Sequence, residues 1–312
     1  MDLSAITLTE LRYVVAVADA GHFGRAAAEC HVSQPTLSTQ IKKLEEQLGV
    51  PLFERSSKRV RLTAAGERIV ERCRVILEEV RAIGDVARGQ QEPLAGPFRL
   101  GVIPTLGPYF LPWLLQPLQA GFPRLRLVLQ ESITATLLDD LALHRLDAAL
   151  LALPVTAPGL TAEALFDEPF FVLAPAAHPL AARKRLRDSD LNGERVLLLT
   201  EGHCLRDQAL DICGSGRTSH DDAFRATSLE TLRHMVAAGL GCTLLPALAV
   251  PGLSNAGTAV ARPFQPPAPH RRIGLVWRRS LPDAAAVRAL GAFIRGHLPG
   301  SVLPVAAQHP GR

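Results

Sequence analysis

Apolar residues in the first 90 positions recur every three or four residues, which is the spacing of amphipathic helices. Three successive helices are predicted, over residues 7–21, 23–30 and 33–49. The first begins with a capping box formed by Thr7 and Glu10, and the third has Ser33 as its N-cap. The two later helices are joined by a tight turn, so residues 23–49 have the pattern of a helix-turn-helix motif.

In that motif the second helix enters the major groove of DNA, with its N-terminal residues next to the base edges. The residues expected to face DNA are Ser33, Gln34, Pro35, Thr36, Ser38, Thr39 and Lys42. A short hairpin follows, and its basic residues suit phosphate contacts: Arg55, Lys58, Arg59 and Arg61. Residues 1–62 are therefore predicted to be a winged helix-turn-helix domain.

A small helical bundle with a solvated polar face is the alternative for this region. Net charge does not separate the two, because residues 1–90 hold 13 Lys or Arg against 12 Asp or Glu. The order of the elements, three capped helices and then a basic hairpin, favours DNA binding.

A long helix is predicted over residues 63–90. Its apolar positions alternate spacings of three and four, as in a coiled coil: Ile69, Cys73, Ile76, Val80, Ile83 and Ala87. We expect the chain to dimerise along this seam. Cys73 is interpreted as a small apolar filler of the seam.

Alternating strand and helix patterns follow a proline- and glycine-containing hinge at residues 91–97. They predict an α/β domain over residues 98–300, with a parallel sheet in which Thr105 and Thr134 follow strand ends. The first lobe should comprise about 98–165 and 268–300, and the second about 166–267. The tail after residue 299 is predicted to be disordered.

Cys204 follows an apolar run at residues 195–199, where a helix is expected to begin. A helix N-terminus and the neighbouring cations His203 and Arg206 would lower the pKa of its thiol, and the thiolate is the reactive form. Nine positions later, Cys213 provides a second thiol that could form a disulfide with an oxidised Cys204. The alternative is that these are two unrelated cysteines.

Composition narrows the class of protein further. The 312 residues suggest two or three domains, and the net charge of +4 is compatible with a nucleic-acid partner. No export signal or membrane span is recognised, so a cytoplasmic protein is expected. The five cysteines are an odd number without metal-site spacing, and we expect no metal and no cofactor.

These features together resemble the LysR-type transcriptional regulators, over nearly the whole chain. Three segments, at residues 202–213, 224–233 and 272–276, are similar to the hydrogen-peroxide-sensing members of that family. The resemblance implies an α/β fold with a winged helix-turn-helix, a long linker helix and a two-lobed, periplasmic-binding-protein-like regulatory domain.

By this resemblance, Cys204 is the peroxidatic cysteine and Cys213 is the resolving one. The implied peroxide pocket consists of Thr105, Thr134, His203, Arg206 and Arg271. From the residues alone, the two threonines could instead be helix N-caps.

The implied partners are a double-stranded DNA operator, hydrogen peroxide as the signal, and a thiol reductant such as glutaredoxin or thioredoxin. RNA polymerase would be a partner of an activator, and the assembly would be a homodimer or homotetramer. Two other functions are kept open: a regulator that binds a small organic effector between its lobes, and a thiol peroxidase. The resemblance favours a regulator that is not an enzyme.

Overall fold

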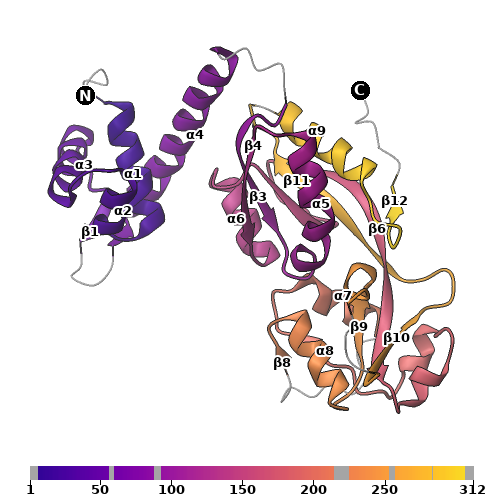
Figure 1. Ribbon diagram of the computed structural model, residues 1–312. Coiled ribbons are helices and arrows are strands. Elements are labelled where there is room, and N and C mark those ends of the chain that lie inside the picture. The colour runs from indigo at the N-terminus through magenta and orange to yellow at the C-terminus, as the bar shows by residue number, and fades with distance from the viewer. Residues whose placement is uncertain are drawn as a thin grey trace. The chain divides into compact units, whose positions relative to one another are not determined.

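The computed structural model describes residues 6–55, 60–87, 93–213, 225–252, 257–282 and 284–305 (Figure 1). The chain divides into two compact units, Met1–Gln91 and Glu92–Arg312, called here the first and second units. No helix within the described ranges is both long enough and apolar enough to cross a membrane.

The first unit contains the predicted helices and hairpin. Its elements are α1 (Leu8–Ala20), α2 (Phe23–Glu29), α3 (Gln34–Leu48), β1 (Phe53–Arg55), β2 (Val60–Leu62) and α4 (Ala64–Ala87). The capping box of Thr7 and Glu10 is present, and α3 ends at Gly49 in the left-handed conformation that glycine adopts easily. Leu37 and Ile41 of α3 are fully buried in the core of this unit.

The long helix α4 departs from the predicted seam in its first half. Cys73 is only 2% exposed and belongs to the core of the first unit, because this half of α4 packs on α1. Ile76, Val80 and Ile83 are 44%, 38% and 68% exposed. The interpretation of Cys73 as part of an intermolecular seam is therefore wrong, and the apolar stripe left for a partner is Ile76, Val80 and Ile83.

The second unit is an α/β structure. Its strands are β3 (Gly96–Val102), β4 (Leu125–Glu131), β5 (Ala148–Leu153), β6 (Leu160–Pro175), β7 (Leu198–Leu199), β8 (Arg225–Ala226), β9 (Thr243–Pro246), β10 (Ala259–Pro263), β11 (His270–Arg278) and β12 (Leu303–Pro304). Its helices are α5 (Gly107–Gly121), α6 (Thr134–Ala142), α7 (Cys204–Cys213), α8 (Leu229–Ala237) and α9 (Ala284–Gly296), with short 3-10 turns at Pro179–Ala182, Asp188–Leu191 and Ala247–Ala249.

The main sheet has the strand order β10-β6-β11-β5-β3-β4, and β3, β4 and β5 run parallel as predicted. The sixteen-residue strand β6 pairs with β11 in its first half and with β9 and β10 in its second half. The second unit therefore has two hydrophobic cores, and Figure 1 shows β6 running from one group of elements into the other. The first draws mainly on residues 94–166 and 273–302, and the second on residues 170–264, so β6 connects two lobes.

The chain after residue 299 is not wholly irregular. Leu303 and Pro304 form β12, which pairs with β6 opposite Asp167 and Phe166. The tail prediction is therefore wrong for this short strand, because an open edge of β6 supplies backbone partners that the local sequence does not reveal.

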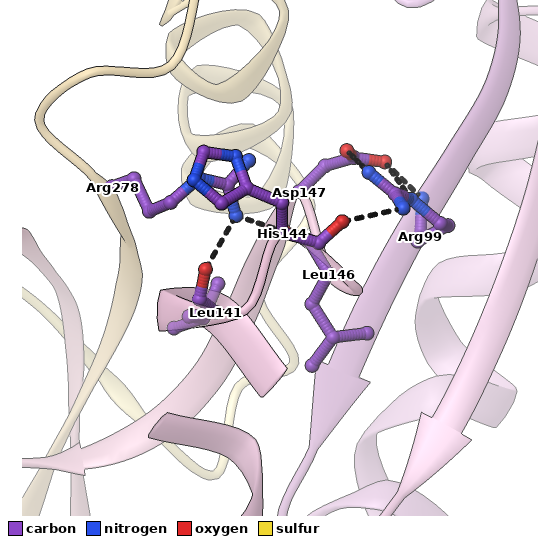
Figure 2. Close-up of polar contacts among 6 residues, drawn as sticks. All are labelled: Arg99, Leu141, His144, Leu146, Asp147 and Arg278. Atoms are coloured by element: carbon purple, nitrogen blue, oxygen red, sulfur yellow. Dashed lines mark hydrogen bonds and ion pairs between the residues drawn. The ribbon is translucent and has the colours of Figure 1, made fainter. Parts of the chain in front are cut away.

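Two arginines fix the turn between α6 and β5 (Figure 2). Arg278 of β11 donates from Nη1 to the carbonyls of Leu141 and Leu146 at 2.7 and 2.6 Å. Arg99 of β3 donates to the carbonyl of His144 at 2.8 Å, and His144 has the left-handed φ of 59° that is unusual for a residue with a side chain. The C-terminal end of α6 is thus held by β3 and β11. Thr134 is the first residue of this helix, at its opposite end.

Candidate functional site

Cys204 is the first residue of α7, shortly after β7, as the sequence predicts. Its side chain packs against the core of the first lobe, whereas Leu205, Ala209 and Cys213 of the same helix belong to the core of the second lobe. The thiol therefore lies where the two lobes meet. Gly202 has a φ of +92°, and a Cβ atom there would lie 3.2 Å from Ile133, so this approach to the helix requires glycine.

Arg271 forms a fully buried polar cluster beside this boundary. Its Nε donates to Glu168 Oε2 at 2.8 Å, and its Nη1 and Nη2 donate to the hydroxyl and carbonyl of Thr105 at 2.8 and 2.9 Å. Glu168 in turn accepts from the backbone N–H of Leu248 at 2.8 Å. Since the side chains of the ion pair are 0% exposed, the guanidinium is held rigidly and dry.

Thr134 lies beside the Cys204 thiol, as expected of a residue of the peroxide pocket. Its hydroxyl lowers the pKa of the Cys204 thiol, yet its buried Oγ1 has no well-formed hydrogen bond within the described part of the chain. The N-cap residues are Ile133 for α6 and Leu106 for α5, so neither Thr134 nor Thr105 caps a helix. The alternative that these threonines are N-caps is therefore wrong.

The thiol of Cys204 is not acidic in this structure. Burial raises its pKa above the ordinary value, more than the charge of Arg271, the hydroxyl of Thr134 and the N–H of Leu205 lower it. The prediction of a lowered pKa was wrong because it counted local charges and the helix terminus but not the desolvation of a thiolate. The cation that acts most strongly on the thiol is Arg271, a residue distant in sequence.

The other two residues of the expected pocket have different positions. His203 is half-buried, and burial lowers the pKa of its imidazole. Arg206 donates from Nη1 to the carbonyl of Leu199 at 3.3 Å, which ties the first turn of α7 to the end of β7. The structure thus places Thr134 and Arg271 beside the thiol, and Thr105 binds the far side of this arginine. Arg206 instead binds a backbone carbonyl.

The raised pKa leads to a pH-dependent expectation. Because only the thiolate reacts, the rate at which iodoacetamide labels Cys204 should rise about tenfold per pH unit from pH 6.5 to beyond pH 8.5. Labelling is followed by mass spectrometry of the tryptic peptide 196–206, which contains Cys204 alone among the cysteines. A plateau reached by pH 7 would instead indicate an acidic thiol and contradict this reading of the site.

Cys213 lies at the opposite end of α7, with 2% of its surface exposed. Burial raises its pKa to about 11. A nine-residue helical separation places the two Cα atoms roughly 13 Å apart, whereas a disulfide requires about 4.4–6.8 Å. The two thiols cannot bond while α7 stays helical.

A cavity of about 650 Å³ lies near the second turn of α7. It is lined by Leu153, Pro154, Val155, Ala162, Ala164, Gln208, His270, Arg271 and Arg272. Its two arginines already have carboxylate partners, since Arg271 pairs with Glu168 and Arg272 with Asp167. An acidic effector would therefore compete with these carboxylates for the arginines.

The predicted DNA-reading residues of α3 share one polar side of the first unit. Gln34, Pro35, Thr36, Thr39 and Lys42 are exposed, as is the N-cap Ser33, and Ser38 is half-buried. Lys42 forms an exposed ion pair with Glu46, at 3.8 Å. Arg61 of β2 is exposed, but Lys58 and Arg59 lie outside the described residues, and only the backbone of Arg55 is described.

Sequence reasoning missed two groups that join the lobes. One is Glu168, the carboxylate that pairs with Arg271. The other is the link between Tyr109 of α5 and Glu230 of α8, at 2.8 Å, with Arg233 donating to the same carboxylate oxygen. Two adjacent carboxylates, Asp167 and Glu168, interrupt the apolar strand at residues 164–175. They were the signal available for Glu168, because a carboxylate inside a strand that is buried needs a partner.

Comparison with known proteins agrees with this architecture. Residues 8–67 match the bacterial regulatory helix-turn-helix family of LysR type, and residues 91–299 match the LysR substrate binding domain. The chain belongs to the LysR family.

Individual relatives are similar over almost their full length. The DNA-binding transcriptional dual regulator OxyR of Escherichia coli K12 is 45% identical over 295 residues, which covers 95% of this chain and 97% of the relative. A full-length OxyR variant from Pseudomonas aeruginosa has a structure with a TM-score of 0.81 and 43% identity, covering 97% and 99% of the two chains. A Corynebacterium glutamicum OxyR mutant with H2O2 bound has a TM-score of 0.65 and 36% identity, covering 93% and 92%.

Proposed function

We propose that this protein is a DNA-binding transcriptional regulator of the oxidative stress response, switched by hydrogen peroxide at Cys204. The observation that carries the proposal is the placement of two thiols at opposite ends of one helix, with Cys204 against a buried cluster of Arg271 and two threonines. The similarity to OxyR over nearly the whole chain supports the same signal.

The first chemical step is attack of the Cys204 thiolate on one peroxide oxygen. The O–O bond breaks, Cys204 becomes a sulfenic acid, and hydroxide leaves and takes up a proton. A thiol with a raised pKa needs help in this step, and donors directed at the leaving oxygen provide it. The unsatisfied hydroxyl of Thr134 and the fixed guanidinium of Arg271 are suited to this role, with Thr105 holding the guanidinium and His203 at the rim.

In the second step, Cys213 attacks the sulfenic sulfur of Cys204, and water leaves as the disulfide forms. Because the helical distance is too long for this bond, α7 must unwind. Leu205 and Ala209 then leave the core of the second lobe, so chemistry at one sulfur changes the packing of a whole lobe.

The partners follow from the same proposal. Double-stranded DNA binds the exposed side of α3, and RNA polymerase is a partner if the protein activates transcription. A homodimer forms along α4. A homotetramer is completed through the second unit, where Trp113 and Leu115 of α5 and Val128 and Leu129 of the edge strand β4 are exposed apolar residues. A glutaredoxin or thioredoxin reduces the disulfide in the cytoplasm, where the DNA is.

The alternatives are less well supported. A thiol peroxidase needs repeated turnover at an accessible thiol, whereas here each cycle would require refolding of α7. A small-effector regulator would need free recognition groups, but the arginines lining the cavity beside α7 are paired with carboxylates.

Mass spectrometry after one equivalent of peroxide tests the proposal. The wild type is expected to link the tryptic peptides 196–206 and 207–217 through Cys204 and Cys213, and to change its affinity for operator DNA. Cys204→Ser should lose both responses, and Cys213→Ser should stop at a sulfenic acid that dimedone traps on Cys204. If Cys204→Ser keeps the DNA response to peroxide, the proposed switch is wrong.

A further inference from the structure

Cys242 is a third thiol of the second lobe that the proposed switch does not use. It is 1% exposed and immediately precedes β9. Its backbone N–H donates to Arg195 at 2.9 Å, and its carbonyl accepts from Leu197 at 2.8 Å. An isolated bridge pairs it with Val196, so Cys242 lies alongside the start of the extended segment that leads into α7.

The path of the chain brings Cys213 back to the same place. The extended segment at residues 195–199 is about 16 Å long and the ten-residue helix α7 about 15 Å. Arg206 fixes the first turn of α7 to Leu199 at the end of that segment, and α7 packs on β7. A helix that follows a strand and packs on it runs in the opposite direction, so its last residue, Cys213, returns over Val196.

The surroundings of the two thiols agree with this geometry. Cys213 and Cys242 belong to one hydrophobic core. Burial raises the pKa of Cys242 to about 12, and the charge of Cys213 is among the groups that raise it further.

We propose that Cys242 is a second disulfide partner of Cys213, and that it ends the peroxide response by thiol–disulfide exchange. The proposal rests on the proposed function, which forms the first disulfide. The Cys242 thiolate attacks the sulfur of Cys213, the Cys204–Cys213 bond breaks, and Cys204 leaves as a thiolate. The proton lost by Cys242 is taken up by Cys204, and no further oxidant or reductant is consumed.

Strain gives the exchange its direction. The Cys204–Cys213 bond requires α7 to be unwound, but a Cys213–Cys242 bond lets Cys213 stay at its helical position in the core. The exchange therefore allows α7 to refold and returns the lobe to its starting packing while the protein is still oxidised. Cys204 is then a free thiol again but has lost its resolving partner, so a second peroxide stops at the sulfenic acid.

The exchange is expected to be slow, and its rate to depend on pH. Because burial raises its pKa far above neutral, only a very small fraction of the Cys242 thiol is ionised at pH 7.5. The reaction should accelerate about tenfold for each pH unit. This delay separates the activated state from its shut-off.

The closing experiment has a first arm that does not involve peroxide. Full-length Cys204→Ser is treated with diamide, free thiols are alkylated, and tryptic peptides are mapped by mass spectrometry. We expect peptide 207–217, with Cys213, linked to peptide 234–271, with Cys242. The control Cys204→Ser, Cys242→Ala should give no such pair, and absence of the pair in Cys204→Ser itself would overturn the proposed proximity.

The second arm follows the wild type and Cys242→Ala after one equivalent of peroxide, with acid quenching at successive times. In the wild type the 196–206/207–217 pair should appear first and be replaced, at least by half, by the 207–217/234–271 pair, about tenfold faster at pH 8.5 than at pH 7.5. In Cys242→Ala, or in Cys242→Val if the alanine variant is unstable, the first pair should persist.

The two proposals fail differently. If the first pair forms and persists equally in both proteins, the exchange is wrong while the peroxide switch stands. If the first pair never forms in the wild type, the switch and the exchange that depends on it are both wrong.

Discussion

Replacement of Glu168 by alanine is expected to lower the free energy of unfolding of the second unit by about 3–5 kcal/mol. The side chains of Glu168 and Arg271 are 0% exposed, so the variant leaves a buried guanidinium without its counter-charge. It also removes the acceptor of the Leu248 N–H. Urea unfolding at pH 7, compared with wild type, measures the loss.

A neighbouring ion pair of the same two strands provides the control. Arg272 pairs with Asp167 at 2.8 Å, but the arginine side chain is 43% exposed. Asp167→Ala is therefore expected to cost at most about 1 kcal/mol. The double variant Glu168→Leu, Arg271→Met should recover most of the stability, since it removes both charges together. Equal losses for Glu168→Ala and Asp167→Ala would show that burial of the first pair has no energetic consequence.

Helix limits were predictable because their signals are local. Thr7 and Glu10 form the predicted capping box, and Ser33 accepts from the N–H of Thr36 as an N-cap does. The start of a helix at Cys204 was predicted for the same reason, from an apolar run followed by a polar turn. Such features involve neighbours within four residues, so no knowledge of the fold is required.

The chemistry of the thiol was not predictable in this way. The sign of the pKa shift at Cys204 depends on burial between two lobes and on Arg271, which only the folded chain brings there. Cys73 shows the same limit, because periodicity places it on an apolar face of α4 but does not say whether α1 or another subunit covers that face. Sequence patterns predict which side chains are buried more reliably than they predict which element or subunit covers those side chains.

For Cys242, the burial could be predicted from the sequence but the neighbouring thiol could not. Its burial, at 1% exposure, agrees with the apolar run around it. Its relation to Cys213 depends on where a strand and the end of a helix meet, and that position follows from element lengths and from the anchor between Arg206 and Leu199. Neither thiol carries a local motif that pairs it with the other.

A charge on the exposed stripe of α4 is expected to abolish DNA binding by abolishing the dimer. Val80 is 38% exposed between Ile76 and Ile83, which are also exposed, and a symmetric interface would bury each stripe against its copy. Val80→Asp would place two uncompensated carboxylates in that interface. Burying one such charge costs about 3–5 kcal/mol, so the dimer should dissociate at least about 100-fold more readily. Binding to a two-half-site operator should fall with it, because each half-site then binds alone.

Arg81→Asp is the matched control for this prediction. Position 81 points about 100° away from Val80 around the helix, and the arginine is exposed, so the substitution adds an aspartate to the same turn without entering the stripe. Sedimentation velocity at micromolar protein should give a dimer or larger assembly for wild type and Arg81→Asp, and a smaller one for Val80→Asp. Circular dichroism should be unchanged in both variants, since Val80 contributes to no core within the first unit. An unchanged assembly in Val80→Asp would mean that the first units pair through another surface, and the apolar stripe of α4 would then need a different partner.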